Sequence, residues 1–343
     1  MNCKKQGVVV LNGEEMEQVD DHVYLGTIIS SNGERFSEMN ARMTKSNSVA
    51  NEIEQICKSP ELSILRLCYV KLLMDSCLDG QVKYGSSLWN VTKYKSYRER
   101  LNKIKPNLLK RVLQVPSATP SAAIQYEFGV NDLTLEILME KIILAVETLN
   151  LSEDRLSKKI FEAMLEKKIP GFCTEVIEAC EVFQVSLVAL QGVNNVREVL
   201  KKRVIQLQSM ELLSRMVISS KMDRLLVSGF SYDGSMKKYL AELEFQESRA
   251  IFISRYRMWP TKENYPGRWS GDLCNICNRK DTDEHIFSCP GYMDLIKDKF
   301  DYQVFWNKDV LEDMVLLKEI AKIVLLLVER MEYIQNLNLS QPL

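Results

Sequence analysis

The sequence predicts a mainly α protein: a helical bundle with a small N-terminal β-hairpin and a C-terminal module built around three cysteines and one histidine. Three observations support this fold class. After Gly33, apolar residues recur at the spacing of helices through most of the 343 residues. Two short apolar runs rich in β-branched residues precede them, separated by turn residues. Near the C-terminus, four residues of the metal-ligand type lie within one loop-rich stretch.

The N-terminal strands are expected at residues 7–11 and 23–29, where Val and Ile are frequent. Asn12-Gly13 is typical of a two-residue hairpin turn, and residues 30–33 have the composition of a closing turn. Two strands alone are marginally stable in water. We therefore expect their apolar faces to pack on the helix at 36–57, or alternatively to associate with another chain, as exposed strand edges do.

The helices are expected in a fixed order along the chain. Ser59-Pro60 has the pattern of a helix start. The helical segments are 36–57, 62–72, a basic segment that ends near 116–120, 133–149, 152–245 with interruptions at 170–171 and 192–195, and a tail from about 311. Residues 80–90 are expected to break the helical pattern, and residues 254–291 are expected to be rich in loops. The predicted organisation is 1–33, a β remnant; 34–150, a first helical domain; 151–250, a helical connector; 251–296, the Cys/His module; and 297–343, a C-terminal helix.

Composition excludes several classes of protein. The chain has 45 Lys and Arg against 46 Asp and Glu, and its hydrophobic share of 46% is ordinary for a globular protein. The longest apolar run, 323–328, is too short to span a bilayer, and the N-terminus lacks the pattern of a signal peptide. Nine cysteines, an odd number, favour a reducing compartment. The expected location is intracellular, nuclear or cytoplasmic, without a membrane.

Cys274, Cys277, His285 and Cys289 form the strongest chemical signal. Two cysteines three residues apart direct both sulfurs to one point, and a His and a Cys four apart lie on one face of a helical turn. Such a closed set of four ligands is typical of a structural Zn²⁺ site. Asp281, Asp283 and Glu284 are candidate acceptors for the imidazole N–H. The alternatives are a Cys274–Cys277 disulfide or unligated thiols.

Two basic stretches are candidate nucleic-acid surfaces. Residues 91–115 hold eight Lys or Arg against one Glu, with Tyr94 and Tyr97 among them. Cations neutralise phosphates and aromatic rings stack on bases. The second stretch, 255–280, lies beside the Cys/His module. The candidate contacts are Lys93, Lys95, Arg98, Arg100 and Lys103 in the first stretch, and Arg257, Arg268 and Trp269 in the second. The alternatives are a solvated helix face and, for the aromatic residues, the small core of a metal module.

No catalytic motif accompanies these surfaces. The sequence contains no GxxxxGK[ST], GxGxxG, GxSxG or HExxH pattern, and His22 and His285 are the only histidines. Asp20-Asp21 resembles a paired-carboxylate metal site, but two adjacent residues of a strand point to opposite faces. A two-metal site also needs further carboxylates nearby. We therefore expect no catalytic residues in this chain.

Several segments together resemble the reverse transcriptases of non-LTR (LINE-type) retrotransposons. The end of the palm in that family is similar to Asn2-x-x-Lys5, Val19-Asp20 and the run from Tyr24 to Gly33, followed by Ala41-Arg42, Ala50 and Tyr84-Gly85-x3-Trp89. The zinc knuckle downstream of the polymerase is similar to Asp281-Thr-Asp-Glu-His285-Ile-Phe-x-Cys289-Pro-x-Tyr292. The order and separation of these motifs match across essentially the whole chain, and the two end motifs are more specific than the helical middle.

The resemblance implies the last palm strands, a helical thumb, a helical connector and a zinc knuckle. In that family the Tyr-Leu-Gly strand, here Tyr24 to Gly26, lies near the primer terminus, and the thumb grips the RNA–DNA duplex. The family's catalytic carboxylates lie upstream of the position that Met1 occupies. Gln6 replaces the family's usual Thr, and the family's nuclease pattern does not follow Cys289. The chain thus resembles a reverse transcriptase that has lost its active site by truncation.

The function we expect is binding of RNA, DNA or an RNA–DNA hybrid, with one structural Zn²⁺ and no polymerase activity of its own. Neither a membrane nor a small-molecule substrate is expected as a partner. Two alternatives remain: a helical scaffold for protein interactions, and an inert retroelement remnant.

Overall fold

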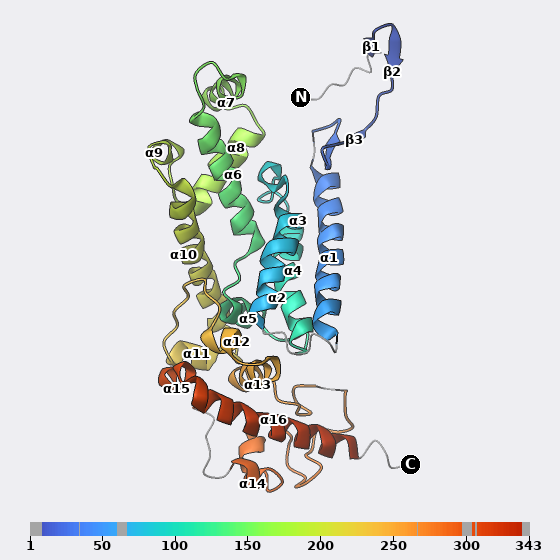
Figure 1. Cartoon of the computed structure of the whole chain (residues 1–343), viewed down its shortest axis with the longest axis vertical. Coiled ribbons are helices and arrows are strands. Elements are labelled where there is room, and N and C mark those ends of the chain that lie inside the picture. Colours follow the sequence, from blue (N-terminus) through green and yellow to red (C-terminus); the bar gives the residue numbers. More distant parts are fainter. Residues whose placement is uncertain are drawn as a thin grey trace. The chain divides into compact units, whose positions relative to one another are not determined.

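The computed structural model describes residues 9–33, 35–59, 67–265, 267–296, 304–305 and 307–337. The chain is mainly α-helical, as predicted (Figure 1). It divides into two compact units, each built from three stretches. Unit 1 comprises Met1–Asn51, Asp75–Ile104 and Asp132–Leu207, and unit 2 comprises Glu52–Met74, Lys105–Asn131 and Gln208–Leu343. The five-segment organisation expected from the sequence stays a prediction.

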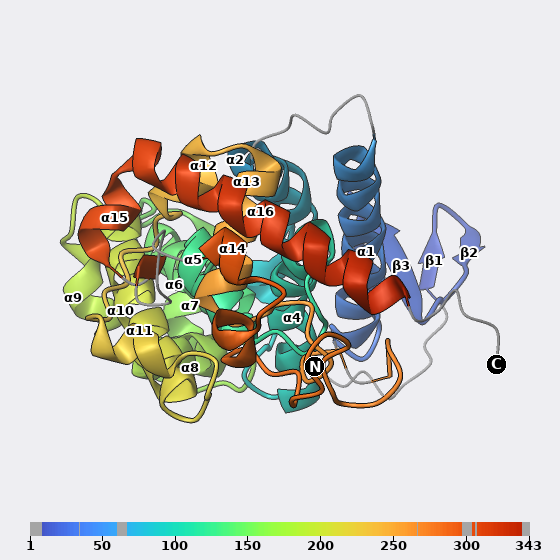
Figure 2. The same cartoon turned by 90° about the horizontal axis from the view of Figure 1, so that it is seen from below.

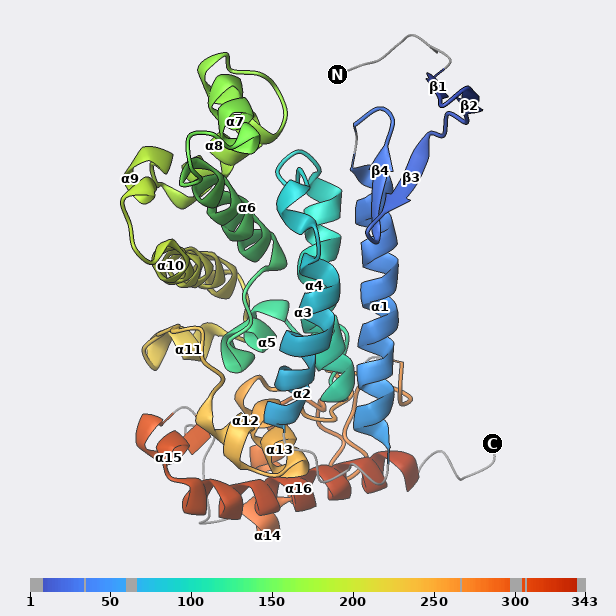
Figure 3. The same cartoon turned by 45° about the horizontal axis from the view of Figure 1, so that its top comes forward.

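The N-terminal β structure consists of two hairpins rather than one. The first pairs β1 (Val9–Leu11) with β2 (Glu14–Met16) around Asn12-Gly13, which confirms the predicted turn. Residues 7 and 8 of the predicted first strand lie outside the described residues. The second hairpin pairs β3 (Asp21–Tyr24) with β4 (Thr27–Ser30), and Figure 3 shows it just ahead of α1 (Phe36–Lys58).

The prediction of one strand over 23–29 was therefore wrong. Leu25 and Gly26 have φ values of 48° and 78°, and Tyr24 pairs directly with Thr27. Two consecutive residues with positive φ form the tight turn whose twist suits a hairpin, and glycine at the second position favours it. The apolar run continues through the turn, so hydrophobicity alone does not reveal the reversal.

The second hairpin contacts α1 through hydrogen bonds, not through the apolar face predicted to pack there, since Val23 and Ile29 are 64% and 44% exposed. The Ile28 N–H donates to the Glu38 carboxylate at 2.7 Å, and the Arg42 guanidinium donates to the Gly26 carbonyl at 2.5 Å. The first hairpin differs from the prediction too, because Val9 and Val10 remain 63% and 59% exposed. Their apolar faces are not covered by any described part of the chain.

Unit 1 is organised around α6 (Leu133–Leu149), which ends where the sequence predicted. This helix is apolar on most sides, so it is buried on most sides. It contacts η3 (Ser86–Leu88), α7 (Leu156–Glu166), α8 (Phe172–Phe183) and α9 (Leu187–Gln191). Unit 1 also contains most of η2 (Met74–Leu78, a π-helical turn), α3 (Asp79–Lys83), and the first parts of α1, α4 (Lys95–Val112) and α10 (Val196–Val217). Gly80 lies inside α3, so the predicted break over 80–90 was partly wrong.

Unit 2 has its core around α13 (Phe245–Arg255), which packs along α16 (Met314–Leu337), as Figure 2 also shows. Its other elements are α2 (Leu67–Leu73), the end of α4, α5 (Ser121–Phe128), the end of α10, α11 (Asp223–Val227), α12 (Lys238–Glu242), η4 (His285–Ser288), α14 (Met293–Ile296) and α15 (Lys308–Glu312). Residues 60–66, which include the first part of the helix predicted at 62–72, lie outside the described residues. Among the described residues, every helix is too short or too polar to cross a bilayer.

Candidate metal centre

The four predicted ligands converge on one point in unit 2. One ligand atom from each of Cys274, Cys277, His285 and Cys289 lies within 4.8 Å of all the others. The Sγ atoms of Cys274 and Cys289 are 3.8 Å apart, and Sγ of Cys277 is 3.2 Å from Nε2 of His285. This arrangement can hold a metal ion.

A tight turn brings the first two cysteines together. The Cys274 N–H donates to the Arg279 carbonyl, and the Asn278 N–H donates back to the Cys274 carbonyl at 3.0 Å. Asn278 adopts a positive φ of 56°, a conformation that asparagine tolerates better than most residues. The Ile276 N–H points at Sγ of Cys274 at 3.5 Å. This backbone donor is suited to stabilise negative charge on the sulfur.

The other two ligands lie on and just after the short 3₁₀ helix η4. The backbone N–H of His285, its first residue, donates to the Thr282 hydroxyl at 3.2 Å. Cys289 follows the helix in an extended conformation and is completely buried. The predicted helical turn between histidine and cysteine is therefore confirmed as a 3₁₀ turn.

Burial controls the protonation of these ligands. It lowers the pKa of His285, because the charged imidazolium loses hydration. It raises the pKa of Cys289 to about 12, because a thiolate loses hydration in the same way. A neutral imidazole is the form that binds metal, and a bound cation displaces thiol protons. The cluster is thus prepared for a cation, which compensates the thiolate charge that burial disfavours.

Of the three acidic residues near the histidine, Asp281 remains the candidate acceptor. It is 1% exposed; its Oδ2 accepts from the Lys262 N–H at 2.9 Å and from the Gln335 amide at 2.7 Å. Its Oδ1 accepts no hydrogen bond from the described residues. Its charge also opposes the burial effect on the pKa of His285. A buried carboxylate oxygen that lacks a hydrogen bond and lies beside the cluster is suited to accept from the imidazole of a metal-bound histidine.

The other two acidic residues have different partners. Asp283 accepts from the Lys221 ammonium at 2.8 Å and from the Asn264 amide at 2.6 Å. Glu284 lies 3.6 Å from the Arg257 guanidinium. Their contacts join the loop before η4 to its surroundings, so they orient the backbone of the module instead of the imidazole.

The five candidate cations of the first basic stretch lie together at the start of α4 in unit 1. Lys93, Lys95, Arg100 and Lys103 are exposed and Arg98 is half-buried. The buried face of the helix carries Tyr97, Leu101 and Ile104. With 3.6 residues per turn, the cations of the helix spread over its solvent side.

The tyrosines between these cations have structural contacts. Tyr97 is 2% exposed and its hydroxyl donates to the Met39 carbonyl at 2.6 Å. The Lys93 ammonium nitrogen lies 5.3 Å from the centroid of the Tyr94 ring, and this ring packs edge-on against Phe36. Tyr97 is therefore a core residue, and Tyr94 is the ring of this stretch that remains half-exposed.

The three candidate contacts of the second basic stretch are engaged within unit 2. The Arg257 guanidinium lies 3.4 Å from Asp223 and 3.6 Å from Glu284. Arg268 lies over the ring of Trp269 at 4.6 Å, and Trp269 is 6% exposed. Arg268 thus keeps exposed surface, whereas Arg257 and Trp269 are held by other side chains. Their role in binding nucleic acid stays a prediction.

The residues implied by the resemblance lie on the second hairpin. Tyr24 is 59% exposed, and Gly26 accepts the hydrogen bond from Arg42 already described. The guanidinium carbon of the same arginine lies 4.5 Å from the centroid of the Tyr84 ring. The Tyr84 hydroxyl in turn donates to the Leu25 carbonyl at 2.6 Å. The tip of this hairpin is therefore fixed in position, with the Tyr24 side chain free of that network.

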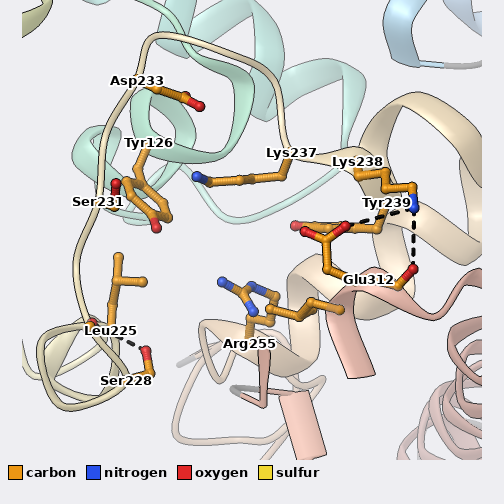
Figure 4. A pocket seen from close by; sticks show the side chains of 12 residues that line it. Tyr126, Leu225, Ser228, Ser231, Asp233, Lys237, Lys238, Tyr239, Arg255 and Glu312 are labelled. Atoms are coloured by element: carbon orange, nitrogen blue, oxygen red, sulfur yellow. Dashed lines mark hydrogen bonds and ion pairs between the residues drawn. The ribbon is translucent and has the colours of Figure 1, made fainter. Parts of the chain in front are cut away.

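Sequence reasoning missed a pocket in unit 2 that is lined by Tyr126, Lys237, Tyr239 and Arg255, among others (Figure 4). In the sequence, Arg255 is only the first residue of the second basic stretch. In the structure it is 3% exposed and its Nε donates to the Glu127 carboxylate at 3.0 Å. These residues are far apart in the sequence, so no local pattern could have indicated the pocket.

Comparisons with protein-family models, with curated proteins and with solved structures found no match for this chain.

Proposed function

We propose that this chain binds nucleic acid, RNA or an RNA–DNA hybrid, and that a single structural Zn²⁺ at the Cys/His cluster holds its C-terminal module together. The observation that carries the nucleic-acid proposal is the group of exposed cations at the start of α4. The proposal includes no catalytic role for the chain. The motifs similar to non-LTR reverse transcriptases add the expectation of a hybrid duplex as ligand.

The geometry of the four ligands supports Zn²⁺. At a Zn–S bond length of about 2.3 Å, a tetrahedral ion places two sulfurs about 3.8 Å apart. The observed Sγ–Sγ separation of Cys274 and Cys289 is 3.8 Å. Three thiolates and one imidazole also suit a borderline-soft ion. Because four protein ligands complete a tetrahedron, no position is left for a substrate, and the proposed role is structural.

Substitution with Co²⁺ tests this part of the proposal. One Co²⁺ per chain, with the visible absorption bands of a tetrahedral thiolate site, is expected from the full chain and should be lost in Cys289→Ser. The matched control is Cys77→Ser, because Cys77 is an exposed thiol outside the cluster. A Cys274–Cys277 disulfide found in freshly purified protein, with no bound metal, would contradict the proposal.

The charges at the start of α4 support binding to phosphates. Among the described residues, Lys93, Arg98, Arg100 and Lys103 have no carboxylate within 4.0 Å, and Lys95 lies 4.0 Å from Glu99. Cations that face solvent with so few carboxylates beside them can replace the counterions of a nucleic acid. The net charge of −1 does not oppose this, because contact with phosphates depends on local charge.

Fluorescence anisotropy with a labelled RNA–DNA hybrid and with matched single strands tests this binding. We expect affinity to fall with salt, and changing Lys93, Lys95, Arg98 and Arg100 to Ala to make the slope of log K against log salt less negative by about three. The control removes four exposed lysines elsewhere in unit 1: Lys159, Lys167, Lys201 and Lys202. Equal effects of the two variants, or no binding at low salt, would refute the proposed surface.

One observation favours the alternative of a protein-interaction scaffold. The strands of the first hairpin carry Val9, Val10 and Leu11 at 59–63% exposure. An exposed apolar edge strand is prone to pair with another chain. Light scattering of the full chain distinguishes the cases: a concentration-independent monomer counts against self-association through this edge, whereas a dimer lost in Val10→Lys supports it.

A further inference from the structure

A pair of aromatic rings lies beside the cations at the start of α4 in unit 1. Phe36, the first residue of α1, is 48% exposed, and Tyr94, the residue before α4, is half-exposed. Their ring centroids are 6.1 Å apart and the ring planes are inclined by 64°, so the two rings meet edge to face. The pair therefore presents aromatic surface to solvent next to positive charge.

Backbone contacts fix the position of the two rings. The Tyr94 carbonyl accepts from the backbone N–H groups of Tyr97 and Arg98, both at 3.1 Å, and so joins the first turn of α4. Met39 lies three residues after Phe36 on α1, and its carbonyl accepts from the Tyr97 hydroxyl at 2.6 Å. The starts of α1 and α4 are thus held together before any ligand arrives, which reduces the ordering cost of binding.

Two cations lie next to this pair of rings. The Lys93 ammonium nitrogen is 5.3 Å from the centroid of the Tyr94 ring. Arg98 follows Tyr94 by four residues, the spacing that places two side chains on the same side of a helix. Neither cation has a carboxylate within 4.0 Å among the described residues. A phosphate can therefore approach either cation without breaking an ion pair.

Acidic side chains near this surface are fewer than the cations. Glu99 lies 4.0 Å from Lys95, and Glu178 of α8 accepts from the Thr92 hydroxyl. Residues 93–103 contain five Lys or Arg against one Glu. The surface thus keeps an excess of positive charge, which favours an acidic ligand. An apolar protein segment would bury the cations without neutralising them, and that is unfavourable.

Rings and cations together distinguish unpaired from paired nucleotides. In a duplex, neighbouring base pairs cover the faces of each base, so a protein meets mainly phosphates and base edges. A single strand also offers base faces, which stack on aromatic side chains irrespective of base identity. Cations alone bind both forms through their phosphates. The additional ring surface favours the unpaired form.

We propose that Phe36 and Tyr94 form a stacking platform for an unpaired base, with Lys93 and Arg98 in contact with the phosphates beside it. This inference rests on the proposed nucleic-acid binding and specifies its ligand. That ligand is a single strand, or the unpaired extension of an RNA–DNA hybrid, in preference to a blunt duplex.

Fluorescence anisotropy of the full chain with three labelled probes tests the proposal: a short single-stranded RNA, a blunt RNA–DNA hybrid, and the same hybrid with an unpaired extension of a few nucleotides. We expect the extended hybrid to bind about tenfold more tightly than the blunt one, the effect of one stacked base. Combining Phe36→Leu with Tyr94→Leu should bring the two affinities together. The salt dependence should persist in this variant, because all cations remain.

Two further variants separate stacking from a structural effect. Tyr94→Phe keeps the ring and should keep the preference for the extended hybrid. Tyr333→Leu removes a ring that is 65% exposed on α16 in unit 2, and it should leave the preference unchanged. Because Phe36 and Tyr94 are both partly exposed, the double leucine variant is expected to fold, which circular dichroism checks.

Equal affinity of the wild-type chain for the two hybrids would overturn the platform, and so would a preference that survives in the double leucine variant. In both cases the cation surface still stands if the Lys and Arg variant weakens binding. No binding of any probe would overturn the surface and the platform together. Self-association in light scattering that is lost in the double leucine variant would assign the rings to a protein contact and overturn the platform as well.

Discussion

The ion pair between Arg255 and Glu127 in unit 2 should contribute far more to folding than a surface pair does. Arg255 is 3% exposed and Glu127 is fully buried. The carboxylate accepts from the arginine at 3.0 Å and from the Tyr256 hydroxyl at 2.6 Å. Glu127→Gln retains a similar shape and one acceptor oxygen, but it leaves the guanidinium buried without an opposite charge.

The expected cost follows from this burial. Removing one partner of a buried ion pair destabilises a protein by about 3–5 kcal/mol, most of it from the uncompensated charge. The amide oxygen of glutamine still accepts one hydrogen bond, so we expect the lower end, about 3 kcal/mol. Urea denaturation of the full chain, followed by circular dichroism, measures the change. Urea is preferred over guanidinium chloride because it does not screen charges.

The matched control is the exposed pair of Arg197 and Glu140 in unit 1, whose side chains are 47% and 27% exposed. Glu140→Gln should cost about 0.5 kcal/mol, since solvent screens such pairs. Arg255→Met combined with Glu127→Leu should recover part of the loss, because no charge then remains unpaired. Equal small losses for Glu127→Gln and Glu140→Gln would refute the reasoning, and so would a double variant less stable than the single one.

Three further predictions concern the metal module, a glycine and the response to acid. Removing the metal with a chelator should expose the backbone amides of the Cys/His module to hydrogen exchange while those of α6 stay protected, because the segment that carries Cys274 and Cys277 contains no helix of its own; equal protection with and without metal would contradict a structural role. Gly129→Ala should destabilise by about 2 kcal/mol or more in urea, because φ is +60° and the new β-carbon meets backbone at 2.4 Å, whereas Gly80→Ala in α3 has open space and should be neutral or stabilising. Burial alone would raise the pKa of Glu54, but its hydrogen bonds from Lys58 and Arg111 lower it below the ordinary 4.5. The pKa of Glu54 is then lower in the folded protein than in the unfolded one. The interactions of Glu54 with Lys58 and Arg111 therefore stabilise the fold above pH 4.5, and this stabilisation is lost as the pH falls through the folded pKa. A urea titration series from pH 6 to pH 3 checks this, and Glu54→Gln should show a smaller loss over that range.

The metal ligands could be predicted from the sequence because they are close along the chain. Cys274 and Cys289 are 15 residues apart, and the spacing of the four ligands reports directly on a local turn and a short helix. Helix α6 could be predicted for a similar reason, since its apolar residues recur over 17 consecutive positions. Both features depend on local spacing, which the sequence displays.

Features that depend on distant partners could not be predicted in this way. Arg255 and Glu127 are 128 residues apart, and nothing near either residue indicates that one neutralises the other. The reversal at Leu25-Gly26 was hidden because apolar residues flank it on both sides. The exposure of Val9 and Val10 could not be predicted either, since it depends on which elements lie over the hairpin.

The division into two units has a consequence for synthesis on the ribosome. The boundaries after Asn51, Ile104 and Leu207 fall inside α1, α4 and α10, so the polypeptide alternates between the units within continuous helices. Unit 1 is complete once Leu207 has emerged, whereas unit 2 waits for its third and longest stretch. Until then the early segments Glu52–Met74 and Lys105–Asn131 have no finished core to join. A nascent chain stalled after Leu207 has left the exit tunnel, but before unit 2 is complete, should therefore present a folded unit 1 and protease-sensitive segments of unit 2.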